Sequence, residues 1–204
     1  IDTLEQKFAI FTEYHAYFTE LWNQRVNAEP GNDLISMLAH GPATRNMAPR
    51  EYFGNIVLLT VGGNDTTRNT ITGSVLALNQ NPDQYAKLRA NPDLIPSMVS
   101  ETIRWQTPLA HMRRVATRDV EMHGKTIRKG DKVVLWYVSG NRDETVFDAP
   151  DRFDITRAKN PHLGFGSGQH VCVGSRLAEM QLRVAFDILA DRVMSSEVIR
   201  SPRR

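Results

Sequence analysis

The residue best suited to chemistry in this chain is Cys172, its only cysteine. It lies in a stretch that reads Phe-Gly-Ser-Gly-Gln-His-Val-Cys-Val-Gly over residues 165–174. Gly166, Gly168 and Gly174 permit tight turns and the close approach of a flat ligand. An apolar helical pattern begins near Cys172, so the helix dipole and unpaired N–H groups favour a thiolate there. A lone cysteine is more often a small buried hydrophobic residue, but this spacing favours a ligand.

A second reactive pattern is Gly-Gly-Asn-Asp-Thr-Thr at residues 62–67, within an apolar helical stretch. A glycine inside a helix costs ~1 kcal/mol relative to alanine, and an acid there needs solvent or a partner. Such local inconsistency is typical of functional sites. The alternative is a plain helix end at the glycine pair, with Asn64 or Asp65 capping a new helix.

Charged pairs supply the remaining candidates. Glu101 and Arg104 are three residues apart, share a helix face and can pair. Taken alone, such a pair is usually a solvated surface contact. Arg113 and Arg114 are adjacent and open a β-rich region, where a solvated strand edge is the simplest interpretation.

The elements that must position these residues are mostly helical. Leu4, Phe8, Phe11, Phe18 and Trp22 share one face of the first helix, which needs an apolar partner. Residues 115–122 and 126–138 are β-branched and broken by His-Gly and Lys-Gly, as in hairpins. The sequence predicts a mainly α fold with a small antiparallel β region. Helices are expected over residues 1–28, 33–40, about 49–81, after Asn81-Pro82, about 92–106, and from near Cys172, where Val173, Leu177, Met180, Val184 and Ile188 form the apolar face.

Taken in order along the chain, these motifs resemble the C-terminal half of the cytochrome P450 superfamily. Residues 165–174 resemble its cysteine loop, residues 92–106 its Glu-x-x-Arg helix, and residues 49–81 its oxygen-binding helix. The resemblance implies a partial P450 fold, with residues 1–204 forming one partial domain. The tail, residues 193–204, departs from the family pattern.

The resemblance also implies roles for the site residues. Cys172 is the thiolate ligand of haem b, which promotes O–O cleavage. Thr66 donates a hydrogen bond to bound dioxygen, and Asp65 relays protons. Arg152, with Arg157 as the fallback, joins Glu101 and Arg104 in a structural group that braces the cysteine loop. Residues expected to contact the cofactor are Gly62, Gly63, Arg114, Phe165, Gly166, His170, Cys172, Gly174 and Ala178.

The implied reaction is a monooxygenation, in which one atom of dioxygen enters a C–H bond and the other becomes water. The chain looks most like bacterial alkane terminal hydroxylases, which take electrons from NADH through a ferredoxin and its reductase. The residues that match pocket-lining positions of the family are apolar, as a small alkyl substrate requires. The same residue types are equally common in an ordinary hydrophobic core. These residues are Leu58, Val61, Leu109 and Ala110. Alternatives are a peroxide-driven hydroxylase, or a non-catalytic haem-thiolate sensing module. Without the N-terminal half, the fragment alone is expected to bind haem poorly or not at all and to be inactive.

Composition excludes several classes of protein. Lysine and arginine number 25 against 23 aspartate and glutamate, a small excess that gives no basic stripe for nucleic acid. The apolar stretches are far shorter than the roughly 20 residues of a membrane span. A single cysteine excludes an internal disulfide and fits a reducing, cytoplasmic location.

Overall fold

The computed structural model describes residues 3–192, and the predicted departure of the tail at residues 193–204 lies outside this range. The chain divides into two compact units, residues 1–62 and 63–204. The boundary falls within one long helix, α3 (Pro49–Gln80). The single partial domain expected from the sequence stays a prediction.

The first unit holds α1 (Leu4–Val26), α2 (Leu34–His40) and the beginning of α3. Thr3 starts α1 with a reciprocal capping box. Aromatic contacts join α1 to α3. The rings of Trp22 and Tyr52 lie 4.4 Å apart, and the Tyr52 hydroxyl donates to the Phe18 carbonyl at 2.8 Å. These contacts use the C-terminal part of the apolar face predicted for this helix.

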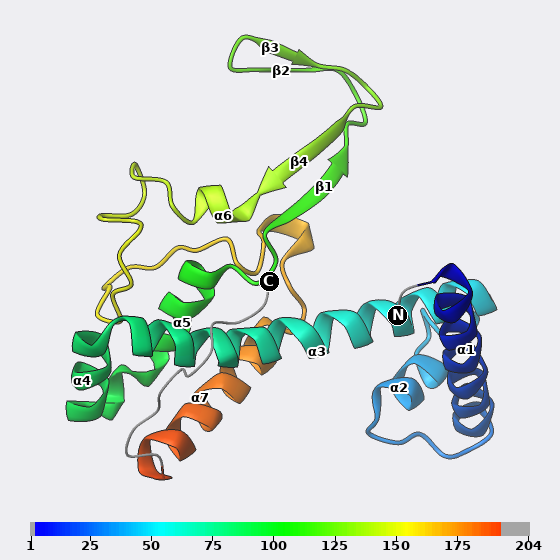
Figure 1. The fold of residues 1–204 in the computed structure, drawn as a ribbon. Helices are drawn as coiled ribbons and strands as arrows, with labels where there is room; N and C mark the ends of the chain where they lie inside the picture. Colours follow the sequence, from blue (N-terminus) through cyan, green and yellow to red (C-terminus); the bar gives the residue numbers. More distant parts are fainter. Residues whose placement is uncertain (1–2, 193–204) are drawn as a thin grey trace. The chain divides into compact units, whose positions relative to one another are not determined.

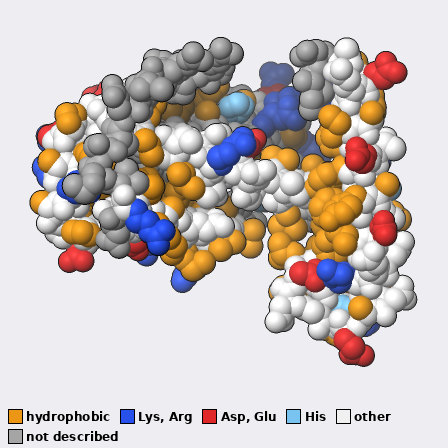
Figure 2. Space-filling model, turned by 60° about the horizontal axis from the view of Figure 1, so that its bottom comes forward, with side chains coloured by type: hydrophobic (Ala, Val, Ile, Leu, Met, Phe, Trp, Pro, Cys, Tyr) orange, Lys and Arg blue, Asp and Glu red, His pale blue; other side chains and the backbone are white. Residues whose placement is uncertain are grey.

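The rest of that apolar face is exposed. Leu4 and Phe8 keep 74% and 70% of their surface, and none of the residues in α1 is buried. The apolar partner that the sequence predicts for this part of the face stays a prediction. Hydrophobic side chains are accordingly prominent on the molecular surface (Figure 2).

The second unit has a helical core. The end of α3 packs with α4 (Pro82–Ala90), α5 (Ile95–Gln106) and α7 (Ser175–Arg192), and a short 3-10 helix, η1 (Pro92–Leu94), leads into α5 (Figure 1). The buried side chains are Ala77, Leu78, Leu88, Ile95, Met98, Val99, Ile103, Phe153, Ile155, Leu182 and Phe186.

The last helix follows the prediction in outline and differs from it in two details. The helix begins at Ser175, three residues after Cys172, because Gly168–His170 and the residues that follow form a 3-10 turn (η2) and a loop. The apolar face predicted for it is exposed, whereas α7 buries Leu182 and Phe186. The exposed side chains are Val173, Leu177, Met180, Val184 and Ile188.

Two small antiparallel ladders confirm the β prediction. β1 (His111–Val115) pairs with β4 (Lys132–Trp136), and β2 (Val120–Met122) pairs with β3 (Lys125–Ile127). His123 and Gly124 both have positive φ, as a two-residue hairpin turn requires. After β4 comes the single turn α6 (Tyr137–Gly140), and then an irregular segment that crosses the unit toward η2.

The helix α3 continues through residues 62–67 without interruption. The alternative that it ends at the glycine pair is therefore wrong. Within the described part of the chain, no helix combines the length and apolar character needed to cross a membrane.

Candidate functional site

A densely hydrogen-bonded polar group lies on the buried face of α5. Glu101 and Arg104 are both fully buried, so their pairing is not the surface contact that their spacing alone suggests. The two side chains meet in a forked arrangement, Nε to Oε2 and Nη2 to Oε1, each at 2.8 Å. A two-point contact of this kind fixes geometry as well as charge.

Arg104 uses every N–H of its guanidinium. Beyond Glu101, Nη1 donates to the carbonyls of Asn141 and Pro150, each at 2.7 Å, and Nη2 donates to the carbonyl of Arg152 at 3.0 Å. All five donors of the side chain are thereby satisfied. Arg104 therefore binds a long stretch of irregular chain to α5.

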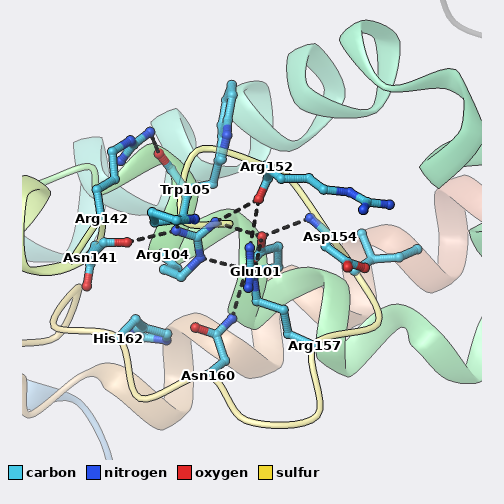
Figure 3. A network of polar contacts seen from close by, with 12 residues as sticks. Glu101, Arg104, Trp105, Asn141, Arg142, Arg152, Asp154, Arg157, Asn160 and His162 are labelled. Atoms are coloured by element: carbon cyan, nitrogen blue, oxygen red, sulfur yellow. Dashed lines mark hydrogen bonds and ion pairs between the residues drawn. The ribbon is translucent and has the colours of Figure 1, made fainter. Parts of the chain in front are cut away.

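Glu101 is equally well bonded (Figure 3). Its Oε1 accepts from the Asp154 N–H at 2.9 Å and from Arg157 Nε at 3.1 Å, and its Oε2 accepts from Asn160 Nδ2 at 3.1 Å. A buried carboxylate is tolerable only with such compensation. Together Glu101 and Arg104 fix residues 150–160, which have no regular structure of their own.

Arg157, and not Arg152, is the third charged member of this group. The side chain of Arg157 pairs with Glu101 and also donates to the carbonyls of Asp148 and Ala149. Arg152 is exposed, and only its carbonyl takes part, while its guanidinium extends away from Glu101 (Figure 3). The prediction for Arg152 is wrong, and its fallback is the residue that pairs.

Asn141 connects this group to the cysteine loop and was missed by sequence reasoning. It is fully buried; its Nδ2 donates to Thr107 Oγ1 at 2.9 Å, and its Oδ1 accepts from the Leu163 N–H at 2.6 Å. Next to Leu163, Gly164 lies so close to Ile103 that a Cβ there would be 2.5 Å from the isoleucine Cγ2. The end of α5 thus positions the chain that enters the loop.

The cysteine loop itself is a tight reversal. Gly166 and Gly168 both have positive φ, 71° and 66°, which side chains rarely adopt. The Cys172 N–H donates to the Phe165 carbonyl at 2.9 Å, which closes the loop. Cys172 is exposed, and a Cβ on Gly174 would lie 3.9 Å from its sulfur.

The surroundings of Cys172 fit a haem better than a bare metal ion. A bare ion needs several protein ligands, and the described residues contain no group of three or more His, Cys, Asp or Glu that could hold one. A haem brings its own nitrogen ligands and asks for a single axial thiolate. Val173, next to the cysteine, is 95% exposed and offers an apolar surface to a flat ring.

The other predicted cofactor contacts stay predictions. His170 is exposed at the end of η2, and Arg114 is half-buried in β1. The Arg114 guanidinium donates to the Arg113 carbonyl, and no carboxylate of residues 3–192 pairs with it. Both side chains suit anionic groups such as propionates. Ala178 is half-buried one turn into α7.

Residues 62–67 lie on exposed turns of α3. Asp65 forms an ion pair with Arg68 at 2.6 Å, with both side chains more than half exposed, while Thr66 is half-buried. A Cβ on Gly62 or Gly63 would meet no described atom within 4 Å. Packing among the described residues therefore does not explain the glycine pair, and the close approach of a ligand to it stays a prediction.

The residues proposed to line a substrate pocket are exposed, each within its own unit. Leu58 and Val61 in the first unit keep 69% and 63% of their surface, and Leu109 and Ala110 in the second unit are also exposed. The alternative that these side chains belong to the core of the described chain is wrong. Lining of a pocket stays a prediction.

His162 is a half-buried titratable group beside the Glu101 network. Burial, together with the positive charge of Arg104, holds the pKa of its imidazole below the ordinary value of 6.5. Its Nδ1 accepts from the Gly164 N–H at 3.2 Å, which requires a neutral ring. The folded protein therefore resists a proton that the unfolded chain takes up.

We expect His162 to make stability fall in acid. Because its pKa is depressed in the folded state, its contribution is present above pH 6.5 and is lost as the pH falls below that value. Urea unfolding of the full-length protein, measured from pH 8 to about pH 5, should show a shallower loss of unfolding free energy in His162→Asn than in the parent. Parallel curves for the two proteins would contradict the assignment.

The comparisons with known proteins agree with this architecture. The family model for cytochrome P450 matches residues 90–190. A linalool 8-monooxygenase of Pseudomonas putida is 49% identical over 98% of this chain and 49% of its own length. A methyl-branched lipid omega-hydroxylase of Mycobacterium bovis is 43% identical over 93% of this chain and 45% of its own length.

A solved structure gives the same result for the fold. A cytochrome P450-153 from Novosphingobium aromaticivorans is 50% identical, with a TM-score of 0.88 over 93% of this chain and 47% of that chain. The predicted fold class is confirmed, and the chain spans about half the length of the relatives it matches. From its sequence motifs, its buried Glu101–Arg104 network and these similarities, the chain belongs to the cytochrome P450 superfamily.

Proposed function

We propose that the full-length protein is a haem-dependent monooxygenase that inserts one atom of dioxygen into a C–H bond. The observation that carries this proposal is the exposed Cys172, held in a closed loop that α5 positions through its buried polar network. Bound haem would supply the redox and oxygen chemistry, with a thiolate ligand promoting O–O cleavage. The residues of this chain hold the group, deliver protons and orient the substrate.

Cys172 is proposed to provide the axial thiolate. Its N–H donates to the Phe165 carbonyl, which closes the turn, and Gly174 adds no side chain beside the sulfur. His170 and Arg114 are proposed to bind the two propionates. The cysteine loop is positioned indirectly, because the segment that leads to it is held by Glu101, Arg104 and Arg157.

Asp65 and Thr66 are proposed to deliver protons. Asp65 is exposed and paired with Arg68, so its carboxylate is in contact with solvent and can exchange protons with it. Thr66 follows directly on the same helix and supplies a hydroxyl that both donates and accepts hydrogen bonds. The two residues thus offer a short path for a proton from solvent toward dioxygen, the cosubstrate.

Terminal hydroxylation of an alkane or another alkyl chain is the proposed specific activity. The relatives that support it are, by name, a linalool 8-monooxygenase and a methyl-branched lipid omega-hydroxylase. Apolar side chains at Leu58, Val61, Leu109 and Ala110 suit such a substrate. A ferredoxin and its reductase are proposed to pass electrons from NADH, in the cytoplasm.

Two alternatives make different demands on the same residues. A peroxide-driven hydroxylase needs no reductase, and in that branch the acid–threonine pair is replaced. A non-catalytic sensing module needs Cys172 but no proton path. The intact Asp65-Thr66 pair favours the NADH-driven enzyme.

We expect Thr66→Ala to uncouple the reaction. In the full-length protein with its redox partners, the variant should bind haem and substrate and consume NADH, but most electrons should leave as hydrogen peroxide. Asp65→Asn should instead slow NADH turnover, by on the order of 100-fold, since it removes a proton carrier. The measurement is product formed per NADH, alongside total NADH consumption. Unchanged coupling in the first variant with normal turnover in the second would contradict the proton path.

A further inference from the structure

Gly73 in α3 is explained by a side chain from another helix. An ideal Cβ at this position would lie 2.3 Å from Cδ and Oε1 of Gln106 and 2.5 Å from its Nε2. Glycine weakens a helix interior, so the position is kept open for this contact. Gly54, on the same helix, has nothing within 4 Å of such a Cβ and offers a matched comparison.

Gln106 uses this space to bond the backbone of α3. It is the last residue of α5, and its Nε2 donates to the Asn69 carbonyl at 2.7 Å. Asn69 lies three residues after Thr66, which is about one helical turn. The bond therefore ties the end of α5 to the turn of α3 that follows the proposed proton-delivering residues.

Stability alone does not explain an amide at position 106. Oε1 of Gln106 is buried and finds no donor among residues 3–192. A buried acceptor without a donor is unfavourable, and an apolar side chain of similar shape avoids that penalty. Unlike an apolar side chain, the glutamine supplies a hydrogen-bond donor to the Asn69 carbonyl. Residues that are locally unfavourable in this way are often functional.

In the turns of α3 beside this bond, two side-chain hydroxyls bond back to the backbone. Thr70 Oγ1 donates to the Thr66 carbonyl at 2.7 Å, and Ser74 Oγ donates to the Thr70 carbonyl at 2.8 Å. Hydroxyls bonded to carbonyls four residues back slightly destabilise helices and often bend them. A second contact from α5 fixes the position of such a segment.

We propose that Gln106 is a positioning residue, whose amide holds the turn carrying Asp65 and Thr66 in register with α5. Because Glu101 and Arg104 on the same helix hold the segment leading to the cysteine loop, α5 sets the position of both parts of the site. This inference rests on the proposed function. It adds that the yield of product per electron depends on the hydrogen bond from Gln106 to Asn69, which lies outside the proposed proton path.

The test is Gln106→Met in the full-length enzyme with its redox partners. Methionine keeps the length of the side chain and removes both the donor and the unpaired acceptor. Haem content, the thiolate spectrum and the thermal midpoint should match the parent. Product per NADH should fall about fivefold, less than the ~100-fold attributed to a 1 Å misplacement of reacting groups.

A double-mutant cycle identifies the contact responsible. Gly73→Ala should displace the glutamine amide and lower coupling to a similar extent, whereas Gly54→Ala should leave coupling unchanged. In the Gln106→Ala background, Gly73→Ala should lower coupling no further, because the amide that it displaces is already gone. Additive losses would overturn the proposed mechanism.

The outcomes separate this inference from the proposed function. Parental coupling in Gln106→Met would overturn the inference, and so would a loss of coupling that merely follows a loss of haem and thermal stability. Thr66→Ala, measured in parallel, tests the proton path itself. Uncoupling in Thr66→Ala with parental coupling in Gln106→Met would leave the proposed function standing and remove only the role of Gln106.

Discussion

Glu101→Gln should prevent stable incorporation of haem into the full-length protein. The substitution keeps the shape of the side chain but removes its charge, which leaves the buried guanidinium of Arg104 without a counter-ion. Removing one partner of a buried ion pair costs about 3–5 kcal/mol, a large share of the 5–15 kcal/mol that stabilises a typical domain. Purified protein should show a low ratio of haem to polypeptide and a lowered unfolding midpoint.

Arg157 and Arg152 provide the matched comparison for this effect. Arg157→Ala removes an ion pair to Glu101 and three hydrogen bonds to carbonyls, so haem content and stability should fall. Arg152→Ala keeps the backbone carbonyl that Arg104 and Arg157 use, so both quantities should remain close to those of the parent. A stable, haem-loaded Glu101→Gln, or equal losses in the two arginine variants, would contradict the network.

The structure pairs Arg157, and not Arg152, with Glu101, and this difference shows a limit of prediction from sequence. The pairing of Glu101 with Arg104 follows from helical spacing, because α5 has a fixed period. Residues 150–160 have no period, and the direction of each side chain depends on local turns. Spacing along the chain therefore could not decide which of two nearby arginines faces Glu101.

Asn141 shows a second limit of the same kind. A buried asparagine that bonds Thr107 and the Leu163 N–H leaves no pattern in the sequence, because its partners are 34 and 22 residues away. The β hairpin at His123-Gly124, by contrast, was predictable, since its turn depends on two adjacent residues with positive φ.

The apolar face of α7 was predicted from the helical spacing of its apolar residues, and the structure has these residues on one side of the helix. The stripe through Leu177, Met180 and Val184 exists, but the described residues bury the opposite positions, Leu182 and Phe186. A helix that is apolar on more than one side gives no signal in its own sequence for which side meets which neighbour. The three-residue offset in its start has a local cause, since η2 and the closed loop occupy the residues before it.

Cys172→Ala should remove every spectral sign of thiolate ligation. Cys172 is the only cysteine of this chain, and the described residues offer no cluster of metal ligands to replace it. Monooxygenase activity should disappear with the thiolate, because an axial ligand that donates electron density promotes O–O cleavage. The fold should survive, since an exposed thiol contributes little burial and the loop is closed by the backbone bond to Phe165.

A serine variant is the matched control. Cys172→Ser keeps the size and polarity of the side chain but replaces sulfur by oxygen, so haem content should be retained better than in Cys172→Ala. The thiolate signature should still be lost. Circular dichroism of the parent and both variants should coincide, which separates loss of the ligand from loss of the fold.

The spectrum of the reduced carbon monoxide complex of full-length protein, recorded for the parent and for Cys172→Ala, tests the assignment of Cys172 most directly. The parent should show the Soret band of a thiolate-ligated haem after reduction with dithionite, and the variant should lack it while keeping its fold. A parent without that band, or a variant that retains it, would contradict the assignment of Cys172 as the haem ligand.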